Sequence, residues 1–283
     1  MKQSGRAFEA LFDIQGAWSE SKRGGVVLQR TRTIHAGDTL EIESYPVWDH
    51  KSTGSICRRE MEKHREAVRR VHMKRRVKQL RRLINNNFTD GDVLMTLTYR
   101  LDEQPEDERS CLRDIQNYIR RVKTKRERMG LASMKYVYTI ERTESEKYGT
   151  RYHAHMIMSG GIDRDELERM WKRGQCNTKR AQRDNHALSG WAHYMSKQKL
   201  TQEKAMKRGW NCSKNLTKPF ETVADKKITP RKAEKIAREA QEEGKKLLCK
   251  LYPGFELTED IEVRSSTWCP GVYLSAQLRR RDG

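Results

Sequence analysis

Apolar and β-branched residues in the middle of the chain gather in three short runs that predict strands. Residues 93–99, with the sequence VLMTLTY, follow an Asp-Gly turn signal and predict the first strand. Residues 135–141 and 151–159 predict two more. The charged connection between the second and third runs ends near a glycine, so these two strands should form an antiparallel hairpin.

Apolar residues spaced three and four apart predict helices between and after these strands. One helix opens at Pro105, a second begins behind Asp163, and a third covers residues 188–199. A short extended piece at residues 175–178 precedes the third helix. The order of strand, helix, strand, strand, helix, strand and helix resembles a split βαβ, ferredoxin-like arrangement. We therefore predict an α+β fold whose central antiparallel sheet carries helices on one face.

Weaker patterns flank this region. An alternating stretch interrupted by a Gly-Asp pair predicts a hairpin in which residues 30–34 pair with residues 40–44. Residues 56–83 contain neither Gly nor Pro and predict a long helix dominated by Arg and Lys. Residues 230–250 predict a charged helix, and residues 261–278 predict late strands.

These patterns divide the chain into three parts. Residues 1–84 hold the hairpin and the long basic helix. Residues 85–225 form the predicted α+β core, with the basic helical segments as extensions. Residues 226–283 supply a C-terminal helix and strands that could pack on this core.

Charge and composition point to a polyanionic partner. The 283 residues carry a formal net charge of +20, and each phosphate that such a protein neutralises releases counterions. Nucleic acid is therefore the expected partner. No apolar run is long enough to span a bilayer, and the N-terminus lacks the apolar core of a signal peptide. The six cysteines form no CxxC pair. We expect a cytoplasmic protein with reduced thiols and no membrane partner.

The long basic helix is the first candidate for contact with phosphates. Any single charge on it is explained by a solvated helix face, but the whole run favours a surface that follows a nucleic-acid backbone. A further lysine lies in the basic segment before Pro219. The candidate nucleic-acid-binding residues are Arg69, Arg70, Lys74, Arg75, Arg76, Lys78, Arg81, Arg82 and Lys214.

Two histidines on the third predicted strand are candidate metal ligands. His153 and His155 are two residues apart, so strand alternation places both imidazoles on one face. A tight hairpin would put Glu141 opposite His153. Two imidazoles and a carboxylate form a mixed site that suits Mg²⁺ or Mn²⁺ acting on phosphate. Glu144 and Glu146 lie in the same connection, and either could replace Glu141.

The last helix of the predicted core carries a candidate nucleophile. Tyr194 lies roughly 110° from the middle of the apolar stripe on this helix, at about 100° per residue. Lys197 is three residues further along and shares its side of the helix. A nearby ammonium group can stabilise the charge that develops when a tyrosine attacks phosphate. The same spacing also suits a packing tyrosine with a lysine beside it.

Three motifs, taken together, resemble the rolling-circle replication initiators of the HUH endonuclease superfamily. The strand at residues 94–99 resembles their first-strand motif, and His153-Ala154-His155 resembles their histidine–hydrophobe–histidine metal motif. Glu141 matches the carboxylate found one strand earlier, and Tyr194 with Lys197 matches the YxxK nucleophile motif. The resemblance covers residues 85–219 and is greatest to phage and plasmid replication-associated proteins of the filamentous-phage gene II type.

This resemblance implies an HUH endonuclease core that uses Mg²⁺ or Mn²⁺. Tyr194 would cut one strand of single-stranded or hairpin origin DNA, forming a 5′-phosphotyrosyl link and freeing a 3′-hydroxyl that primes synthesis. Lys197 would supply positive charge. A helicase and the host replication machinery are implied partners, because the sequence holds no ATP-binding loop of its own.

Two rival functions stay open at this point. A mobilisation relaxase or a single-tyrosine transposase would share the same chemistry with a different biological outcome. A regulator that binds nucleic acid without catalysis would need only the basic helix.

Overall fold

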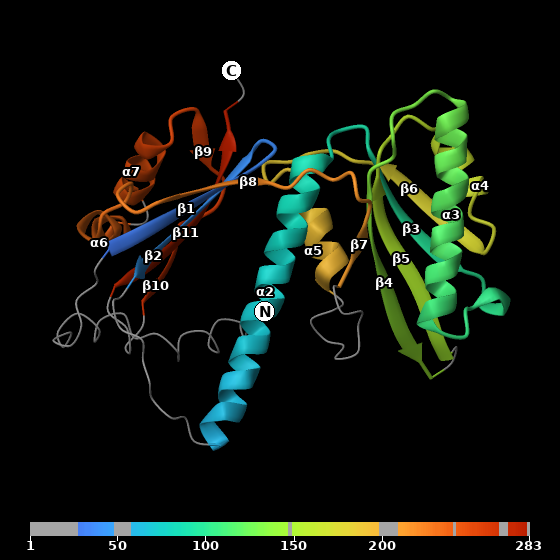
Figure 1. Ribbon diagram of the computed structural model, residues 1–283, viewed down its shortest axis with the longest axis horizontal. Helices are drawn as coiled ribbons and strands as arrows, with labels where there is room; N and C mark the ends of the chain where they lie inside the picture. The colour runs from blue at the N-terminus through green and yellow to red at the C-terminus, as the bar shows by residue number, and fades with distance from the viewer. Residues whose placement is uncertain are drawn as a thin grey trace. The chain divides into compact units, whose positions relative to one another are not determined.

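The computed structural model describes residues 28–47, 58–146, 149–197, 209–239, 242–265 and 271–281 (Figure 1). These residues form two compact units. One unit spans Glu62–Lys218, and the other consists of the strands before it and the segment after it. Each unit contains an antiparallel sheet with helices packed on it, so the predicted α+β class is confirmed.

The sheet of the Glu62–Lys218 unit has five strands in the order β6-β3-β5-β4-β7, and all its neighbours are antiparallel. The three strands predicted from apolar runs are its centre, and the extended piece predicted at residues 175–178 is the middle of an edge strand. The strands are β3 (Val93–Tyr99), β4 (Tyr136–Ser145), β5 (Gly149–Met158), β6 (Gly174–Arg180) and β7 (Asn211–Cys212).

Helices α3 (Glu108–Arg128) and α4 (Arg164–Arg169) cover one face of this sheet, and a 3-10 turn, η2 (Leu101–Glu103), precedes α3 (Figure 1). The α3 helix begins where the Asp107 side chain accepts a hydrogen bond from a backbone amide in its first turn. Asp163 caps α4 in the same way, as predicted. Both helices therefore start at acidic caps that complement the helix dipole.

The other face of the sheet is covered by the last turns of α2 (Arg58–Asn87) and by α5 (Ser189–Lys197). Val137 on β4 and Ile157 on β5 are fully buried on this face. The prediction of helices on one face is therefore wrong. Both central strands carry apolar side chains on two faces, and each face must be removed from water.

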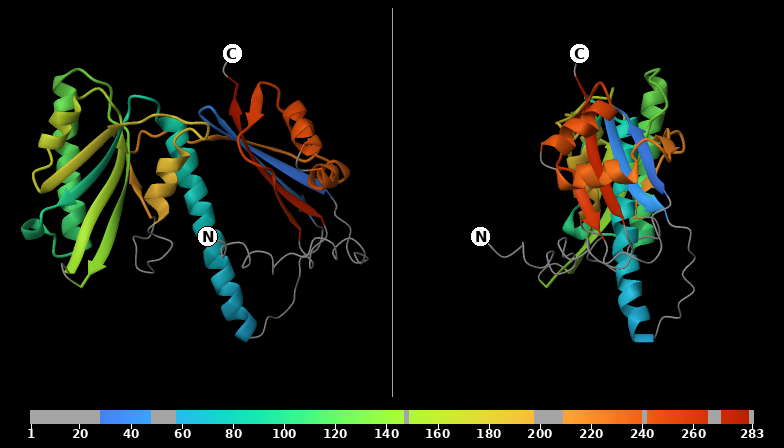
Figure 2. Two further views of the ribbon diagram at one scale, coloured as in Figure 1. Left: turned by 180° about the vertical axis from the view of Figure 1, so that it is seen from behind. Right: turned by 90° about the vertical axis from the view of Figure 1, so that its left-hand side faces the viewer.

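The second unit holds the predicted N-terminal hairpin within a six-stranded sheet of order β10-β11-β2-β1-β8, in which β9 also pairs with β11. Two helices, α6 (Pro230–Arg238) and α7 (Glu243–Leu251), pack on it (Figure 2). The hairpin is confirmed. Its strands and their partners are β1 (Leu28–Ala36), β2 (Thr39–Val47), β8 (Phe220–Ala224), β9 (Phe255–Leu257), β10 (Glu262–Ser265) and β11 (Val272–Arg280).

The single charged helix predicted over residues 230–250 is wrong, because the chain forms two helices there. Gly244, in the first turn of α7, is buried against the end of α6. A Cβ atom at this position would lie 2.7 Å from the carbonyl oxygens of both Ile236 and Glu239. Only glycine allows the two helices to approach this closely.

The two compact units group the chain differently from the predicted division at residues 84 and 225. The hairpin shares its sheet with strands from the C-terminal segment, whereas the end of α2 packs in the core of Glu62–Lys218. Local patterns do not show which distant strand completes a sheet. The division predicted from the sequence therefore kept together segments that are adjacent along the chain. Among the described helices, none is both long and apolar enough to cross a membrane.

Candidate active site

The β4–β5 hairpin brings a carboxylate and two imidazoles together on one face of the sheet. Glu141 pairs with His153 in the register, as predicted from the length of the connection. The Glu141 side chain reaches diagonally and accepts a hydrogen bond of 2.8 Å from Nε2 of His155. Both side chains are almost fully buried. The prediction that Glu141 lies beside the histidine pair is confirmed.

The two alternative carboxylates lie elsewhere. Glu144 has a side chain that is 71% exposed, and it pairs with Arg142 at 2.6 Å. Glu146 is exposed at the turn that ends β4. Among these three residues, Glu141 is thus the one that contacts a histidine.

Two threonines on β3 hold the opposite side of the imidazoles. The Thr96 hydroxyl lies 3.1 Å from Nδ1 of His155, and the Thr98 hydroxyl lies 3.2 Å from Nδ1 of His153. Each threonine is the cross-strand partner of the histidine that it contacts. With Nδ1 held in this way, the Nε2 edge of each ring is directed away from β3.

Sequence reasoning missed both threonines. The signal was present, because Thr96 and Thr98 alternate along their strand with the same spacing as the two histidines. Using this signal required the pairing of β3 with β5, which is a contact between distant segments.

Burial lowers the pKa of His153, and the nearby Arg151 and His155 lower it further, whereas Glu141 acts in the opposite direction. The pKa of free histidine is already below neutral pH. The neutral imidazole is therefore favoured at neutral pH, and this is the form that binds a cation.

Helix α5 brings the predicted nucleophile to this site. The ring centroid of Tyr194 lies 4.8 Å from that of His155, and the two rings meet edge to face. Trp191 stacks on Tyr194 with 5.2 Å between centroids and lies 6.3 Å from His155, so the three rings form one group. Tyr194 is nevertheless 45% exposed. The tyrosine is thus packed against two rings and still open to solvent.

Asn85, at the end of α2, sets the start of α5. Its side chain accepts a hydrogen bond from the Leu188 backbone amide at 3.1 Å and donates one to the Ser189 hydroxyl at 3.2 Å. Asn85 is itself buried. The position of Tyr194 above the sheet therefore depends on α2 as well as on the apolar side of its own helix.

Lys197 is the last residue of α5, and its side chain lies outside the described residues. The same is true of the Arg70 side chain on α2. The other predicted phosphate contacts differ in exposure. Arg82 is only 8% exposed, which disfavours contact with DNA. Exposed or half-buried side chains belong to Arg69, Lys74, Arg75, Arg76, Lys78, Arg81 and Lys214.

The donor set fits a divalent cation by its chemistry. Imidazole nitrogens and carboxylate oxygens are both ligand types that proteins use for divalent cations. Within the part of the chain that the structure describes, no three His, Cys, Asp or Glu side chains already converge as a metal cluster. The Nε2 edge of His155 is instead turned to Glu141, so these two donors contact each other.

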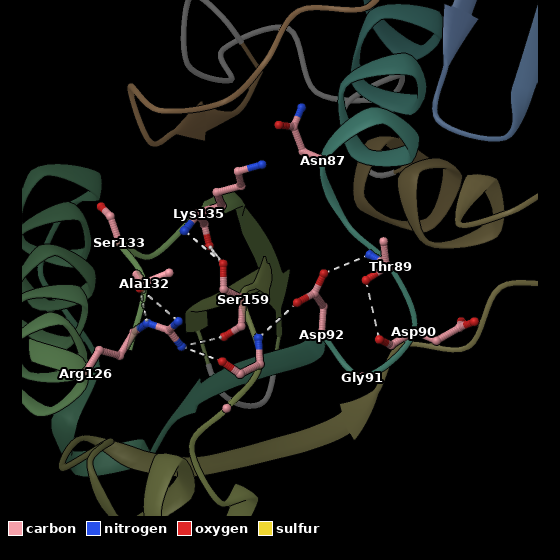
Figure 3. A pocket seen from close by; sticks show the side chains of 12 residues that line it. Asn87, Thr89, Asp90, Gly91, Asp92, Arg126, Ala132, Ser133, Lys135 and Ser159 are labelled. Atoms are coloured by element: carbon pink, nitrogen blue, oxygen red, sulfur yellow. Dashed lines mark hydrogen bonds between the residues drawn. The ribbon is translucent and has the colours of Figure 1, made fainter. Parts of the chain in front are cut away.

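An open cavity of about 500 Å³ lies at the other end of the β3–β5 pair (Figure 3). The Arg126 side chain lines this cavity, and its guanidinium donates hydrogen bonds to the carbonyls of Ala132, Ser159 and Gly160. Asp92 accepts a hydrogen bond from the Gly160 amide in the same wall. These contacts fix the loop after β5, and neither histidine lines the cavity.

Comparison with known proteins places this site within a matched segment. Residues 92–199 match the family model for replication-associated proteins of the ORF2 and gene II protein type. The match covers less than half of the chain, but it contains the histidine pair, Glu141 and Tyr194. It supports a role in replication initiation and in contact with DNA, in agreement with the predicted resemblance at that level. No curated protein and no solved structure matches the chain.

Proposed function

We propose that this protein is a metal-dependent endonuclease that nicks and rejoins single-stranded DNA at an origin of rolling-circle replication. One observation carries the proposal. Tyr194 lies against His155 at 4.8 Å, although the two residues come from different elements of the fold. A candidate nucleophile that is 45% exposed therefore lies beside a buried histidine and its carboxylate partner within the matched segment.

Tyr194 supplies the nucleophile in this mechanism. Its phenolic oxygen attacks the scissile phosphorus, and the bond from phosphorus to the 3′ oxygen breaks. The phenol loses its proton, and a proton ends on the departing oxygen. The products are a 5′-phosphotyrosyl link and a 3′-hydroxyl, which host replication proteins would extend as a helicase unwinds the duplex. Attack by a 3′-hydroxyl on the phosphotyrosyl link reverses the step and rejoins the strand.

The side chains around Tyr194 prepare this attack. Trp191 and His155 restrict its ring, and Lys197 is proposed to place positive charge near the phosphate. His153, His155 and Glu141 would hold Mg²⁺ or Mn²⁺, which polarises a phosphoryl oxygen when bound. Thr96 and Thr98 orient the two imidazoles for that role.

The deciding experiment detects the covalent intermediate. The protein is incubated with single-stranded DNA from the replicon that encodes it, together with Mn²⁺, and then denatured. We expect a protein–DNA adduct that survives denaturation and disappears on proteolysis. If the protein binds the DNA but no strand gives an adduct, it is a binding protein without catalysis.

Glu141→Gln should weaken Mn²⁺ binding by about 10- to 100-fold, because the carboxylate charge is lost while an oxygen that accepts from His155 is kept. Glu144→Gln is the matched control, since Glu144 is exposed and pairs with Arg142. Mn²⁺ affinity is measured by calorimetry on both variants. A loss confined to Glu144→Gln would move the third ligand to that residue.

Neutralising Lys74 and Arg75 on α2 should weaken DNA binding to every sequence tested. Each lost phosphate contact should lower the slope of log affinity against log salt by about 0.7 for a single strand. Arg113→Gln removes one charge from the exposed surface of α3 and serves as the control. Affinities are measured by fluorescence anisotropy over a range of salt. An effect on only one DNA sequence would show that α2 reads bases.

A further inference from the structure

The unit that contains β1 and β8 carries a group of aromatic rings outside the matched segment. The ring of His35 on β1 lies 6.0 Å from Phe220 on β8 and 6.2 Å from Phe255 on β9, measured between centroids. Phe220 is 66% exposed. A large ring left in water on a sheet edge has a free face on which another flat group can stack.

Two cations border these rings. The Arg280 guanidinium lies 5.8 Å from the centre of the Phe255 ring, and the Lys227 ammonium lies 3.7 Å from that of Tyr252. Burial is the largest cause that lowers the pKa of His35, and the positive charges of Lys227 and Arg280 lower it further. Both cations therefore act on the ring at the centre of the group.

These cations also differ from others in the same unit. Arg30 pairs with Asp225, Arg32 pairs with Glu221 and Glu43, and Arg264 pairs with Glu262. In contrast, neither Lys227 nor Arg280 has a carboxylate partner among the described residues. Positive charge that is not neutralised within the protein is available to an external anion.

We propose that His35, Phe220, Phe255, Lys227 and Arg280 form a second binding surface for single-stranded nucleic acid. Bases stack on the exposed Phe220 ring, and the phosphates between them lie against Lys227 and Arg280. Exposed rings bordered by cations are how proteins bind single strands without reading their sequence. The proposal rests on the proposed function only for the identity of the strand as DNA, and it requires no cleavage.

The charge of the surface favours this occupant over a second copy of the chain. β8 is an edge strand, and such strands are able to pair with one another. A second copy would bring Lys227 and Arg280 of two chains to the same interface, whereas a polynucleotide supplies the opposite charge. Dimerisation is therefore an outcome that the experiment must separate from DNA binding.

The test uses the full chain and a fluorescent oligothymidylate in EDTA, so that no nicking occurs. Phe220→Ala should weaken binding by about tenfold without changing the salt slope, because stacking carries no charge. Arg280→Gln and Lys227→Gln should each lower the slope by about 0.7. Val223→Ala is the matched control. Val223 is 56% exposed on the same strand, and strand alternation directs it to the other face.

Photocrosslinking to bromodeoxyuridine should additionally label the peptide that contains Phe220. Unchanged affinity in Phe220→Ala, or an equal loss in Val223→Ala, would overturn the proposal. The proposal would also be overturned if sedimentation shows that the protein is a dimer, and if Phe220→Ala dissociates this dimer without changing DNA affinity. The covalent-adduct assay is independent of these measurements. A missing adduct with the Phe220 effect intact rejects the nicking function alone, and a normal adduct without the Phe220 effect rejects this surface alone.

Discussion

Tyr194→Phe is expected to abolish the covalent protein–DNA adduct while leaving DNA affinity nearly unchanged. The substitution removes one oxygen atom and keeps the ring that packs against His155 and Trp191. Loss of the nucleophile should lower the nicking rate by at least about 10³-fold, as in other enzymes that lose the attacking group. The 45% exposure of Tyr194 means that the change leaves no buried polar group unpaired.

The measurement compares adduct yield on denaturing gels with affinity from fluorescence anisotropy. Tyr136→Phe is the matched control, because Tyr136 is a half-buried tyrosine on β4 that stacks on Tyr138 instead of a histidine. Tyr136→Phe should form the adduct normally. An unchanged adduct yield in Tyr194→Phe would place the nucleophile on another residue.

His155→Ala is expected to cause the second largest loss, about 10²- to 10³-fold in nicking rate. His155 contacts Glu141, Thr96 and Tyr194 at once, whereas His153 contacts Thr98. His153→Ala should therefore lose less activity. Because the missing ligand weakens metal binding, raising Mn²⁺ should restore part of the rate in both variants.

Folding must be monitored in the same experiment, since His155 is only 4% exposed and its replacement leaves the Thr96 and Glu141 side chains without a partner. Such losses cost about 1 to 3 kcal/mol each in stability. Thermal unfolding distinguishes that effect from lost catalysis. His193→Ala, an exposed histidine on α5, is the control and should nick at the normal rate. Full nicking in EDTA would contradict the proposed role of the metal.

Local patterns predicted the parts of the site that lie within single elements. The alternation of His153 and His155 placed both rings on one face, and the short β4–β5 connection placed Glu141 opposite His153. Helical periodicity likewise placed Tyr194 away from the apolar side of α5. These relations follow from strand and helix geometry, which repeats every two or 3.6 residues and is readable from the chain.

Contacts between distant elements were decided by the tertiary structure. Thr96 and Thr98 meet the histidines only because β3 pairs with β5, and Tyr194 meets His155 only because α5 packs on the second face of the sheet. The burial of Val137 and Ile157 made that second face available. By its periodicity alone, a short apolar run buried on both faces cannot be told from a segment of a buried helix.

The sequence by itself therefore determined the α+β class, the central strands and the helix that carries Tyr194, and it left Glu141, Glu144 and Glu146 as alternative neighbours of the histidines. Tertiary structure alone decided which sheet the N-terminal hairpin joins, that helices cover both faces, and that Tyr194 contacts His155. The physical reason is the range of the forces involved. Backbone geometry and hairpin length act over a few residues, whereas burial of apolar faces selects partners across the whole chain.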